Sequence, residues 1–292
     1  NLVVLTVDDK PTIATVATPA AICAGSSLTT TLLPAPTVTA NGSTVTAQGF
    51  ELETSVGGGT YAALSLPYTV TFADNGKNIR YYATNGCGTS YSNLVVLTVD
   101  DKPTIATVAT PADICAGSSL TTTLLPAPTV TANGSTVTAQ GFELETSVGG
   151  GTYAALSLPY TVTFADNGKN IRYYATNGCG TSYSNLVVLT VDDKPTIATV
   201  ATPADICAGS SLTTTLLPAP TVTANGSTVT AQGFELETSV GGGTYAALSL
   251  PYTVTFADNG KNIRYYATNG CGTTYSNLVV LTVDDKPTIA TV

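Results

Sequence analysis

The chain repeats itself with a period of 92 residues. The decapeptide at residues 1–10 recurs at Asn93, Asn185 and Asn277, so three periods fill 276 of the 292 residues and the last 16 begin a fourth copy. The copies differ in only two columns, one holding Ala21, Asp113 and Asp205 and the other Ser90, Ser182 and Thr274. Solenoid repeats have about 20–50 residues, whereas a small β domain has about 100. We therefore expect tandem domains, none of them specialised.

Boundaries between the copies fall where a short polar run precedes a proline. Residues 8–10 are Asp-Asp-Lys, and Pro11 follows as a tolerated first residue of a strand. We predict repeats at residues 11–102, 103–194 and 195–286. Residues 1–10 are expected to be the last strand of a preceding repeat, and residues 287–292 the first strand of a following one. Both ends of the sequence are strand-like, so we interpret the chain as a window on a longer array.

Each copy is predicted to be a β-sandwich of seven or eight short strands. Turn signals recur about every 8–12 residues, β-branched residues are frequent, and helical periodicity is missing. In the first copy the expected strands are residues 12–18, 28–32, 37–40, 43–46, 50–53, 68–72, 78–83 and 93–99, and residues 61–64 follow the turn at residues 57–59.

Two positions in this strand pattern give specific expectations. Asn41 and Gly42 give the strongest hairpin signal, because both residues tolerate the positive φ angles of a type I′ turn. Asn41 also begins a glycosylation sequon, although the turn alone explains it. In residues 50–53 the alternation predicts that Phe50 and Leu52 face the core while both glutamates face solvent.

The composition excludes several classes of function. The chain has no histidine, which removes Ser-His-Asp triads and histidine metal ligands, and we predict neither an enzyme nor a cofactor. Ten Lys and Arg residues on a chain of net charge −9 argue against nucleic-acid binding. No apolar run approaches the roughly 18 residues of a membrane span. Glu51 and Glu53 are spaced to share one strand face rather than to flank a glycosidase cleft.

Residues 74–88 resemble the E–F corner and strand F of immunoglobulin-like domains. The chain departs from antibody domains because Ile79 stands at the tyrosine-corner position, Tyr81 at the strand-F cysteine, and Phe50 in place of the strand-C tryptophan. Residues 22–29 and 81–88, each with one cysteine, resemble the Ig-like tandem repeats of large Bacteroidetes cell-surface proteins, including gliding-motility adhesins. That resemblance covers the whole period. It implies secretion, attachment at a cell surface, and a structural or adhesive role without catalysis.

Each copy carries two cysteines, which we expect to form disulfides: Cys23, Cys87, Cys115, Cys179, Cys207 and Cys271. Two cysteines per copy without histidine are too few for a zinc site. A bond within one repeat, Cys23 to Cys87, is the simple pairing and stays open. In a seven-strand Ig sandwich, however, these two turns lie at opposite ends of strands about 20 Å long. That geometry favours Cys23–Cys179 and Cys115–Cys271, and it leaves Cys87 and Cys207 for neighbours outside the sequence.

Acidic residues at the boundaries are the only metal candidates, as weak calcium ligands: Asp8, Asp9, Asp100, Asp101, Asp192 and Asp193. The alternative is a solvated acidic linker, which the absence of an Asp-x-Asp-x-Asp loop favours. Lys10 and Lys77 fall in predicted turns rather than in a core, which argues against isopeptide bonds at either residue.

These features together predict a structural extracellular filament or adhesin stalk at the cell surface. Residues 100–103 form a short, proline-stiffened linker, and inter-domain disulfides would add a second tether at each joint. The expected partners are further copies of the repeat, with surface glycans or neighbouring filaments as additional partners. The alternative is a carbohydrate- or surface-binding module that acts through exposed loops such as the turn at Asn41.

Overall fold

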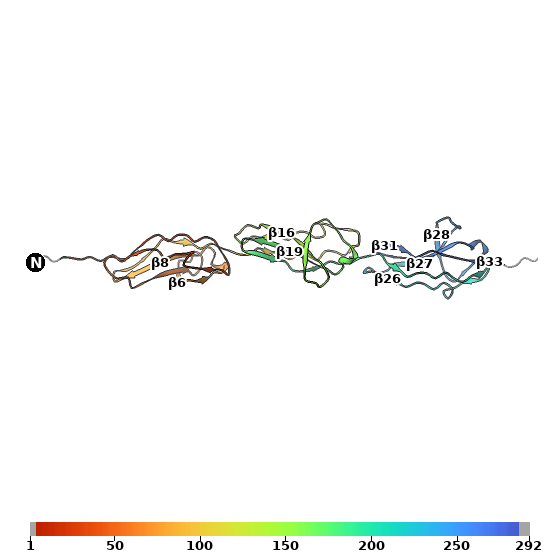
Figure 1. Cartoon of the computed structure of the whole chain (residues 1–292), viewed down its shortest axis with the longest axis horizontal. Helices are drawn as coiled ribbons and strands as arrows, with labels where there is room; N and C mark the ends of the chain where they lie inside the picture. The colour runs from red at the N-terminus through yellow and green to blue at the C-terminus, as the bar shows by residue number, and fades with distance from the viewer. Residues whose placement is uncertain (1–3, 286–292) are drawn as a thin grey trace, which may run out of the picture. The chain divides into compact units, whose positions relative to one another are not determined.

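The computed structural model describes residues 4–285, which form three successive sets of short strands (Figure 1). The first set is β1 (Thr12–Ile13), β2 (Ile22–Cys23), β3 (Ser27–Leu28), β4 (Val38–Thr39), β5 (Ala47–Glu53), β6 (Tyr61–Leu64), β7 (Tyr68–Thr69), η1 (Phe72–Asp74), β8 (Asn78–Asn85), β9 (Gly88–Tyr91), β10 (Val95–Val96) and β11 (Val99–Asp100). The only helices in the described part are three single 3-10 turns, one in each set. The all-β prediction is therefore confirmed.

The same elements recur with the 92-residue period. The second set is β12 (Thr104–Ile105), β13 (Ile114–Cys115), β14 (Ser119–Leu120), β15 (Val130–Thr131), β16 (Ala139–Glu145), β17 (Tyr153–Leu156), β18 (Tyr160–Thr161), η2 (Phe164–Asp166), β19 (Asn170–Asn177), β20 (Gly180–Tyr183), β21 (Val187–Val188) and β22 (Val191–Asp192). The third set is β23 (Thr196–Ile197), β24 (Ile206–Cys207), β25 (Ser211–Leu212), β26 (Val222–Thr223), β27 (Ala231–Glu237), β28 (Tyr245–Leu248), β29 (Tyr252–Thr253), η3 (Phe256–Asp258), β30 (Asn262–Asn269), β31 (Gly272–Tyr275), β32 (Val279–Val280) and β33 (Val283–Asp284).

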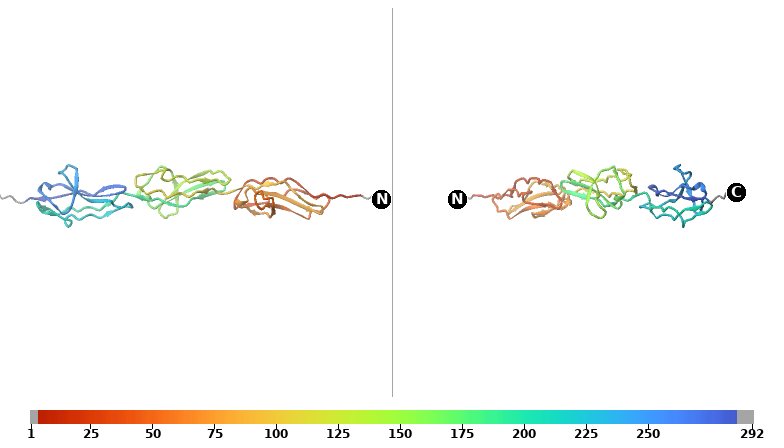
Figure 2. Two further views of the ribbon diagram at one scale, coloured as in Figure 1. Left: turned by 180° about the vertical axis from the view of Figure 1, so that it is seen from behind. Right: turned by 45° about the vertical axis from the view of Figure 1, so that its right-hand side comes forward.

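Each set is an immunoglobulin-like β-sandwich, whose strands can be followed by colour in Figure 2. In the first repeat β10, β8, β5 and β6 are hydrogen-bonded in that order, and β9 pairs with the other half of β8. The remaining strands form three two-stranded ladders, β1–β4, β3–β7 and β2–β11. These short ladders supply the second layer, and each of their six strands has only two residues.

Strand β8 shows why the sequence folds this way. Its burial alternates, with Ile79, Tyr81, Ala83 and Asn85 buried and the residues between them half-buried. Tyr81 packs edge-to-face on Phe50 of β5, with ring centroids 4.8 Å apart. The core around this pair is built from small and branched side chains: Val16, Ile22, Leu28, Leu33, Leu52, Leu64, Val70, Ile79, Val95, Leu97 and Val99.

The last strand of each repeat joins the two layers. Val95 pairs antiparallel with Ile79 in the five-stranded sheet, whereas Val99 pairs parallel with Ile22 of β2. Between them Leu97 is fully buried, and its backbone bonds to Gly76 and Lys77. The predicted single strand 93–99 is therefore two short strands in different ladders.

The prediction of a hairpin at Asn41 and Gly42 is wrong. Both residues have positive φ angles, 53° and 95°, as a type I′ turn requires. Strand β4, however, pairs with β1, residues 43–46 form no strand, and β5 pairs with β6 and β8. The turn thus leads from β4, which pairs with β1, to the five-stranded sheet that contains β5. The Asn41 side chain donates to the carbonyl of Lys10 in the boundary segment and to the hydroxyl of Thr12 at the start of β1.

Other predicted strands are shorter than expected. Only Thr12 and Ile13 of residues 12–18 are in a strand, because the backbone of Val16 bonds to the Asn93 side chain instead of a strand, with N–Oδ1 2.8 Å and O–Nδ2 3.0 Å. Residues 28–32 contribute only Leu28 to a strand. The run 68–72 ends at Thr69, and Phe72 begins the 3-10 turn with 40% of its surface exposed.

The described residues divide into two compact units according to their contacts. One unit runs up to Val108 and adds residues 127–142 and 172–185, and the other contains the remainder. The division passes through the second repeat and not through either linker, because residues on both sides of a linker contact each other. The predicted strand at residues 287–292, and residues 1–3, lie outside the described residues.

Candidate functional site at the joints between repeats

Hydrogen bonds from both repeats hold the linker between the first and second repeats. The carbonyl of Asp100 accepts a hydrogen bond of 2.8 Å from the backbone N–H of Ala24 in the first repeat. The N–H of the next residue, Asp101, donates at 2.9 Å to the carbonyl of Asn133 in the second. Consecutive residues are thus fixed to different repeats. We call residues 100–104 together with the groups that bind them the first joint.

Two asparagine side chains hold the rest of the first joint. The amide nitrogen of Asn133 donates to the carbonyl of Lys102 at 2.7 Å and to the hydroxyl of Thr104 at 2.8 Å. The amide nitrogen of Asn177, which is 5% exposed, donates to the carbonyl of Asp101 at 2.7 Å. Because Asn133 has a φ of 54°, asparagine suits both its backbone conformation and its hydrogen bonds. The side-chain nitrogen of Asn133, which is the counterpart of the sequon residue Asn41, is therefore already hydrogen-bonded within the joint.

A disulfide runs beside this backbone connection. Cys23 of the first repeat is bonded to Cys179 of the second, with Cα atoms 5.5 Å apart. Cys23 lies in β2 directly opposite Asp100, and the N–H of Cys179 donates to the side-chain oxygen of Asn177 at 2.9 Å. The same network that fixes the linker therefore fixes both cysteines.

The second joint, residues 192–196, repeats the backbone contacts and the disulfide. Asp192 accepts from the N–H of Ala116 at 2.8 Å, and Asp193 donates to the carbonyl of Asn225 at 2.9 Å. Cys115 is bonded to Cys271, again with Cα atoms 5.5 Å apart. The two disulfides are the pairs that strand geometry favoured, and the pairing within one repeat does not occur among the described residues.

A lysine and a glycine complete each joint. The aliphatic part of Lys102 lies over Gly180, where a Cβ atom would come within 3.0 Å of the lysine Cε. Gly180 also has a φ of 127°, which side chains rarely adopt. A glycine beside Cys179 is therefore required both by its own backbone and by the linker.

The boundary aspartates are used in the joints rather than gathered around an ion. One carboxylate oxygen of Asp101 accepts from the N–H of Lys102 at 2.7 Å, and Asp9 and Asp193 do the same in their copies. Within residues 4–285 no group of three or more His, Cys, Asp or Glu side chains is placed to hold a metal ion.

Glu53 is buried, contrary to the prediction that it faces solvent. It is 2% exposed, and its carboxylate accepts from the N–H of Gly59 at 3.0 Å and from the N–H and amide of Asn78 at 3.1 and 2.9 Å. The backbone N–H groups of Gly59 and Asn78 lower the pKa of Glu53 more than its burial raises it. The loop that follows β5 folds back over this side chain, which strand alternation alone does not indicate.

Asp74 is a second buried carboxylate. Burial by itself would raise the pKa of Asp74, but hydrogen bonds from the ammonium of Lys77 and from the backbone and hydroxyl of Thr71 together lower it. Lys77 lies 2.8 Å from one carboxylate oxygen, and the hydroxyl of Tyr68 donates at 3.2 Å to the other. Lys77 is therefore held as an ion pair.

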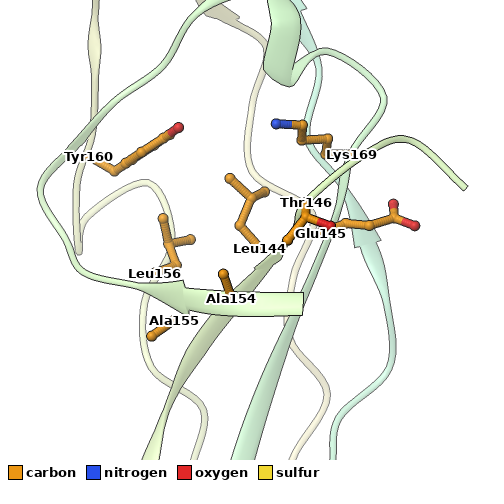
Figure 3. A pocket seen from close by; sticks show the side chains of 8 residues that line it. All are labelled: Leu144, Glu145, Thr146, Ala154, Ala155, Leu156, Tyr160 and Lys169. Carbon is orange, nitrogen blue, oxygen red and sulfur yellow. The ribbon is translucent and has the colours of Figure 1, made fainter. Parts of the chain in front are cut away.

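An open cavity lies beside this cluster in each repeat. In the second repeat the cavity measures about 310 Å³, and Leu144, Leu156 and Ala154 line its apolar floor (Figure 3). The Tyr160 hydroxyl and Lys169 ammonium face it, and both are bound to Asp166. The polar groups at the cavity thus satisfy one another, and they offer no nucleophile paired with a base.

An arginine between two tyrosines was not anticipated from the sequence. The guanidinium carbon of Arg80 lies 3.9 Å from the ring centroids of both Tyr61 and Tyr91, and its Nε is 2.7 Å from Glu51. These residues come from four different stretches of chain, and the register of β5, β6, β8 and β9 brings them together. Glu51 is therefore an ion-pair partner on the sheet surface.

No family model matches the chain, and no curated protein matches it in sequence. Among solved structures it is similar to an I-band fragment of titin, with a TM-score of 0.49 and 13% identity over 95% of this chain and 100% of that one. It is also similar to the N-terminal eight Ig domains of Down syndrome cell adhesion molecule (TM-score 0.45, 16% identity, 95% of this chain, 37% of that one). A third is Sidekick-1 immunoglobulin domains 1–5 (TM-score 0.31, 15% identity, 95% and 59%).

No helix within residues 4–285 has the length and apolar character needed to cross a membrane.

The asparagine clamp can be tested at one joint. In Asn133→Gly the backbone keeps its positive φ but loses two side-chain hydrogen bonds, each worth about 1 kcal/mol. We expect the Asp101 amide to exchange with deuterium about ten-fold faster or more. Asn225→Gly, which changes only the second joint, should leave Asp101 exchange unchanged. Equal exchange in Asn133→Gly and the unaltered chain would contradict the clamp.

The buried glutamates should make stability depend on pH. Hydrogen bonds lower the pKa of Glu145 in the folded state, so its stabilising contribution is complete above its unfolded pKa of about 4.3 and is lost as the pH falls through the folded pKa. Glu145→Gln should lower the free energy of unfolding at pH 7. Between pH 4.5 and pH 3 the variant should lose less of that free energy than the unaltered chain does, as measured by urea unfolding. Asp113→Asn, at an exposed position, controls for charge, and parallel pH profiles for all three chains would contradict the assignment.

Proposed function

We propose that the chain is a load-bearing segment of a structural extracellular filament or adhesin stalk. The observation that carries this proposal is the construction of the joints. Each has two covalent connections, the backbone and a disulfide, and both are fixed by hydrogen bonds to the two repeats. Two separate tethers oppose bending and twisting, which a stalk under tension requires and a freely jointed chain of binding modules does not.

The near-identity of the repeats supports the same role. The three copies are identical outside the two variable columns, and the same cavity is present in all three. A catalytic site would normally distinguish one copy, so we propose a protein that is not an enzyme and needs no cofactor.

Further copies of the repeat are the partners we propose first. Leu5 is 84% exposed and Val7 81%, whereas Leu97 and Val99, one period later, are fully buried in their own repeat. This contrast supports the assignment of residues 1–10 to the last strand of a preceding repeat. Neighbouring filaments and surface glycans are further proposed partners.

Disulfides form and persist in oxidising compartments, and the two disulfides fit the proposed location outside the cell. The resemblance to Bacteroidetes surface repeats agrees with that location and stays a prediction. The alternative role, a carbohydrate-binding module acting through the turn at Asn41, gains no support: its side chain binds Lys10 and Thr12, and the turn has no aromatic residue.

The tension-bearing role predicts how far the chain can be stretched. With both disulfides intact, the shortest covalent path uses residues 1–23, 115–179 and 271–292, about 110 residues. At about 3.5 Å per residue this path spans about 390 Å, against about 1,000 Å for the reduced chain. Single-molecule pulling from the two ends should reach these two limits before and after reduction.

Two serine variants separate the observed pairing from pairing within a repeat. Cys87→Ser should leave the oxidised limit at about 390 Å, whereas Cys179→Ser should raise it to about 480 Å, the span of residues 1–115 and 271–292. If Cys87→Ser lengthens the oxidised chain, the load does not pass between repeats and the proposal fails.

The native material provides a second test. A filament or stalk should appear in electron micrographs of the source cells as long thin fibres. Non-reducing peptide mapping of those fibres should recover the peptide pair joined through Cys23 and Cys179. Isolated short particles, or fibres without the cross-linked pair, would contradict a structural role.

A further inference from the structure

Two cysteines in the chain carry no disulfide, and both are exposed: Cys87 and Cys207. Each is the counterpart of cysteines that are bonded in other copies. Cys87 occupies the position of Cys179 and Cys271, and Cys207 occupies that of Cys23 and Cys115. The chain therefore allows a direct comparison between bonded and unbonded forms of the same two sites.

The site around Cys87 is built in the same way whether or not the bond is present. The N–H of Cys87 donates to the side-chain oxygen of Asn85 at 2.9 Å, as Cys179 donates to Asn177 at 2.9 Å. The Asn85 amide donates to the carbonyl of Asp9 at 2.7 Å, which matches the bond from Asn177 to Asp101. Neighbouring contacts, and not the disulfide, thus set the position of this cysteine.

The site around Cys207 is equally complete. Cys207 of β24 pairs with Asp284 of β33, in the register in which Cys23 pairs with Asp100. The N–H of Ala208 donates to the carbonyl of Asp284 at 2.8 Å, the same distance as from Ala24 to Asp100. The side chain of Cys207 is exposed where that of Cys23, in its disulfide, is half-buried.

We propose that Cys87 and Cys207 are preformed covalent docking sites for one further repeat on each side. Cys207 takes the cysteine that corresponds to Cys271 in a following repeat, and Cys87 takes the cysteine that corresponds to Cys23 in a preceding one. The partner is a repeat of this kind in the same continuous chain, because each observed disulfide accompanies a backbone linker bound to both repeats. This inference rests on the proposed function and extends its joint in both directions.

The chemistry is a two-electron oxidation. The thiolate of Cys207 attacks a mixed disulfide that an oxidising disulfide has formed on the partner cysteine. The new S–S bond forms as the oxidant's sulfur leaves. Overall, two cysteine thiols lose two protons and two electrons, and the oxidant, a small-molecule or protein disulfide, is reduced to two thiols.

The inference predicts a thiol count that does not grow with length. The chain as it is should show two reactive thiols per molecule, and iodoacetamide should label Cys87 and Cys207. A chain lengthened at its C-terminal end by one 92-residue repeat, oxidised in the same glutathione buffer, should again show two. Label should disappear from Cys207 and appear on its counterpart in the added repeat.

A matched control removes only the partner thiol. In the lengthened chain with serine at the added position that corresponds to Cys271, the count should rise to three and Cys207 should be labelled again. If Cys207 stays reactive in the lengthened chain while Cys23–Cys179 and Cys115–Cys271 are intact, this inference is overturned and the proposed function stands. A bond between Cys207 and Cys87, in one chain or between two, would also overturn it. Loss of the two original disulfides would overturn both.

Discussion

Each joint depends on one constraint: two consecutive linker residues are hydrogen-bonded to different repeats. Asp100 completes a strand pair with β2, and Asp101 is already bound by the turn at Asn133. A linker peptide with free backbone dihedrals on either side could rotate; here the hydrogen bonds on both sides remove that freedom. The disulfide between Cys23 and Cys179 follows from the same arrangement, because Cys23 is paired with Asp100 and Cys179 is oriented by the asparagine that binds Asp101.

Asparagine side chains in this fold form hydrogen bonds with backbone groups that longer strands would otherwise satisfy. Asn93 bonds both backbone groups of Val16, and Asn75 accepts from the N–H of Val99 at 3.0 Å. Asn85 binds the carbonyls of Asp9 and Ala40. An amide side chain offers the same donor and acceptor as a peptide group, so it can satisfy backbone that has no strand neighbour. Strands of two residues are sufficient for this reason.

The buried carboxylates are also satisfied by hydrogen bonds from nearby groups. Glu53 accepts hydrogen bonds from Gly59 in the loop that follows β5 and from Asn78 at the start of the neighbouring strand β8. Asp74 accepts from Thr71 and Lys77, each three residues away along the chain. Within residues 4–285 no buried side-chain nitrogen or oxygen lacks a hydrogen-bond partner. A core of mostly small and branched residues buries little apolar surface, so an unpaired buried polar group would remove a large share of the free energy of folding.

The period and the all-β class could be predicted from the sequence alone, because repetition, alternation and turn residues are local signals. The number of strands could not: seven or eight were predicted for each repeat and eleven are present among the described residues of each, since the predicted run 93–99 is divided into two strands and β2 and β9 form outside the predicted runs. Strand lengths and an assumed sandwich topology were also enough to favour Cys23–Cys179 over Cys23–Cys87. The partners of particular side chains were decided only by the tertiary structure. Asn41 and Gly42 have the φ angles of a hairpin, yet the Asn41 side chain binds Lys10 and Thr12, which lie 31 and 29 residues away in the sequence. Glu53 and the stack of Arg80 between Tyr61 and Tyr91 depend on loop closure and strand register, and no local pattern carries that information.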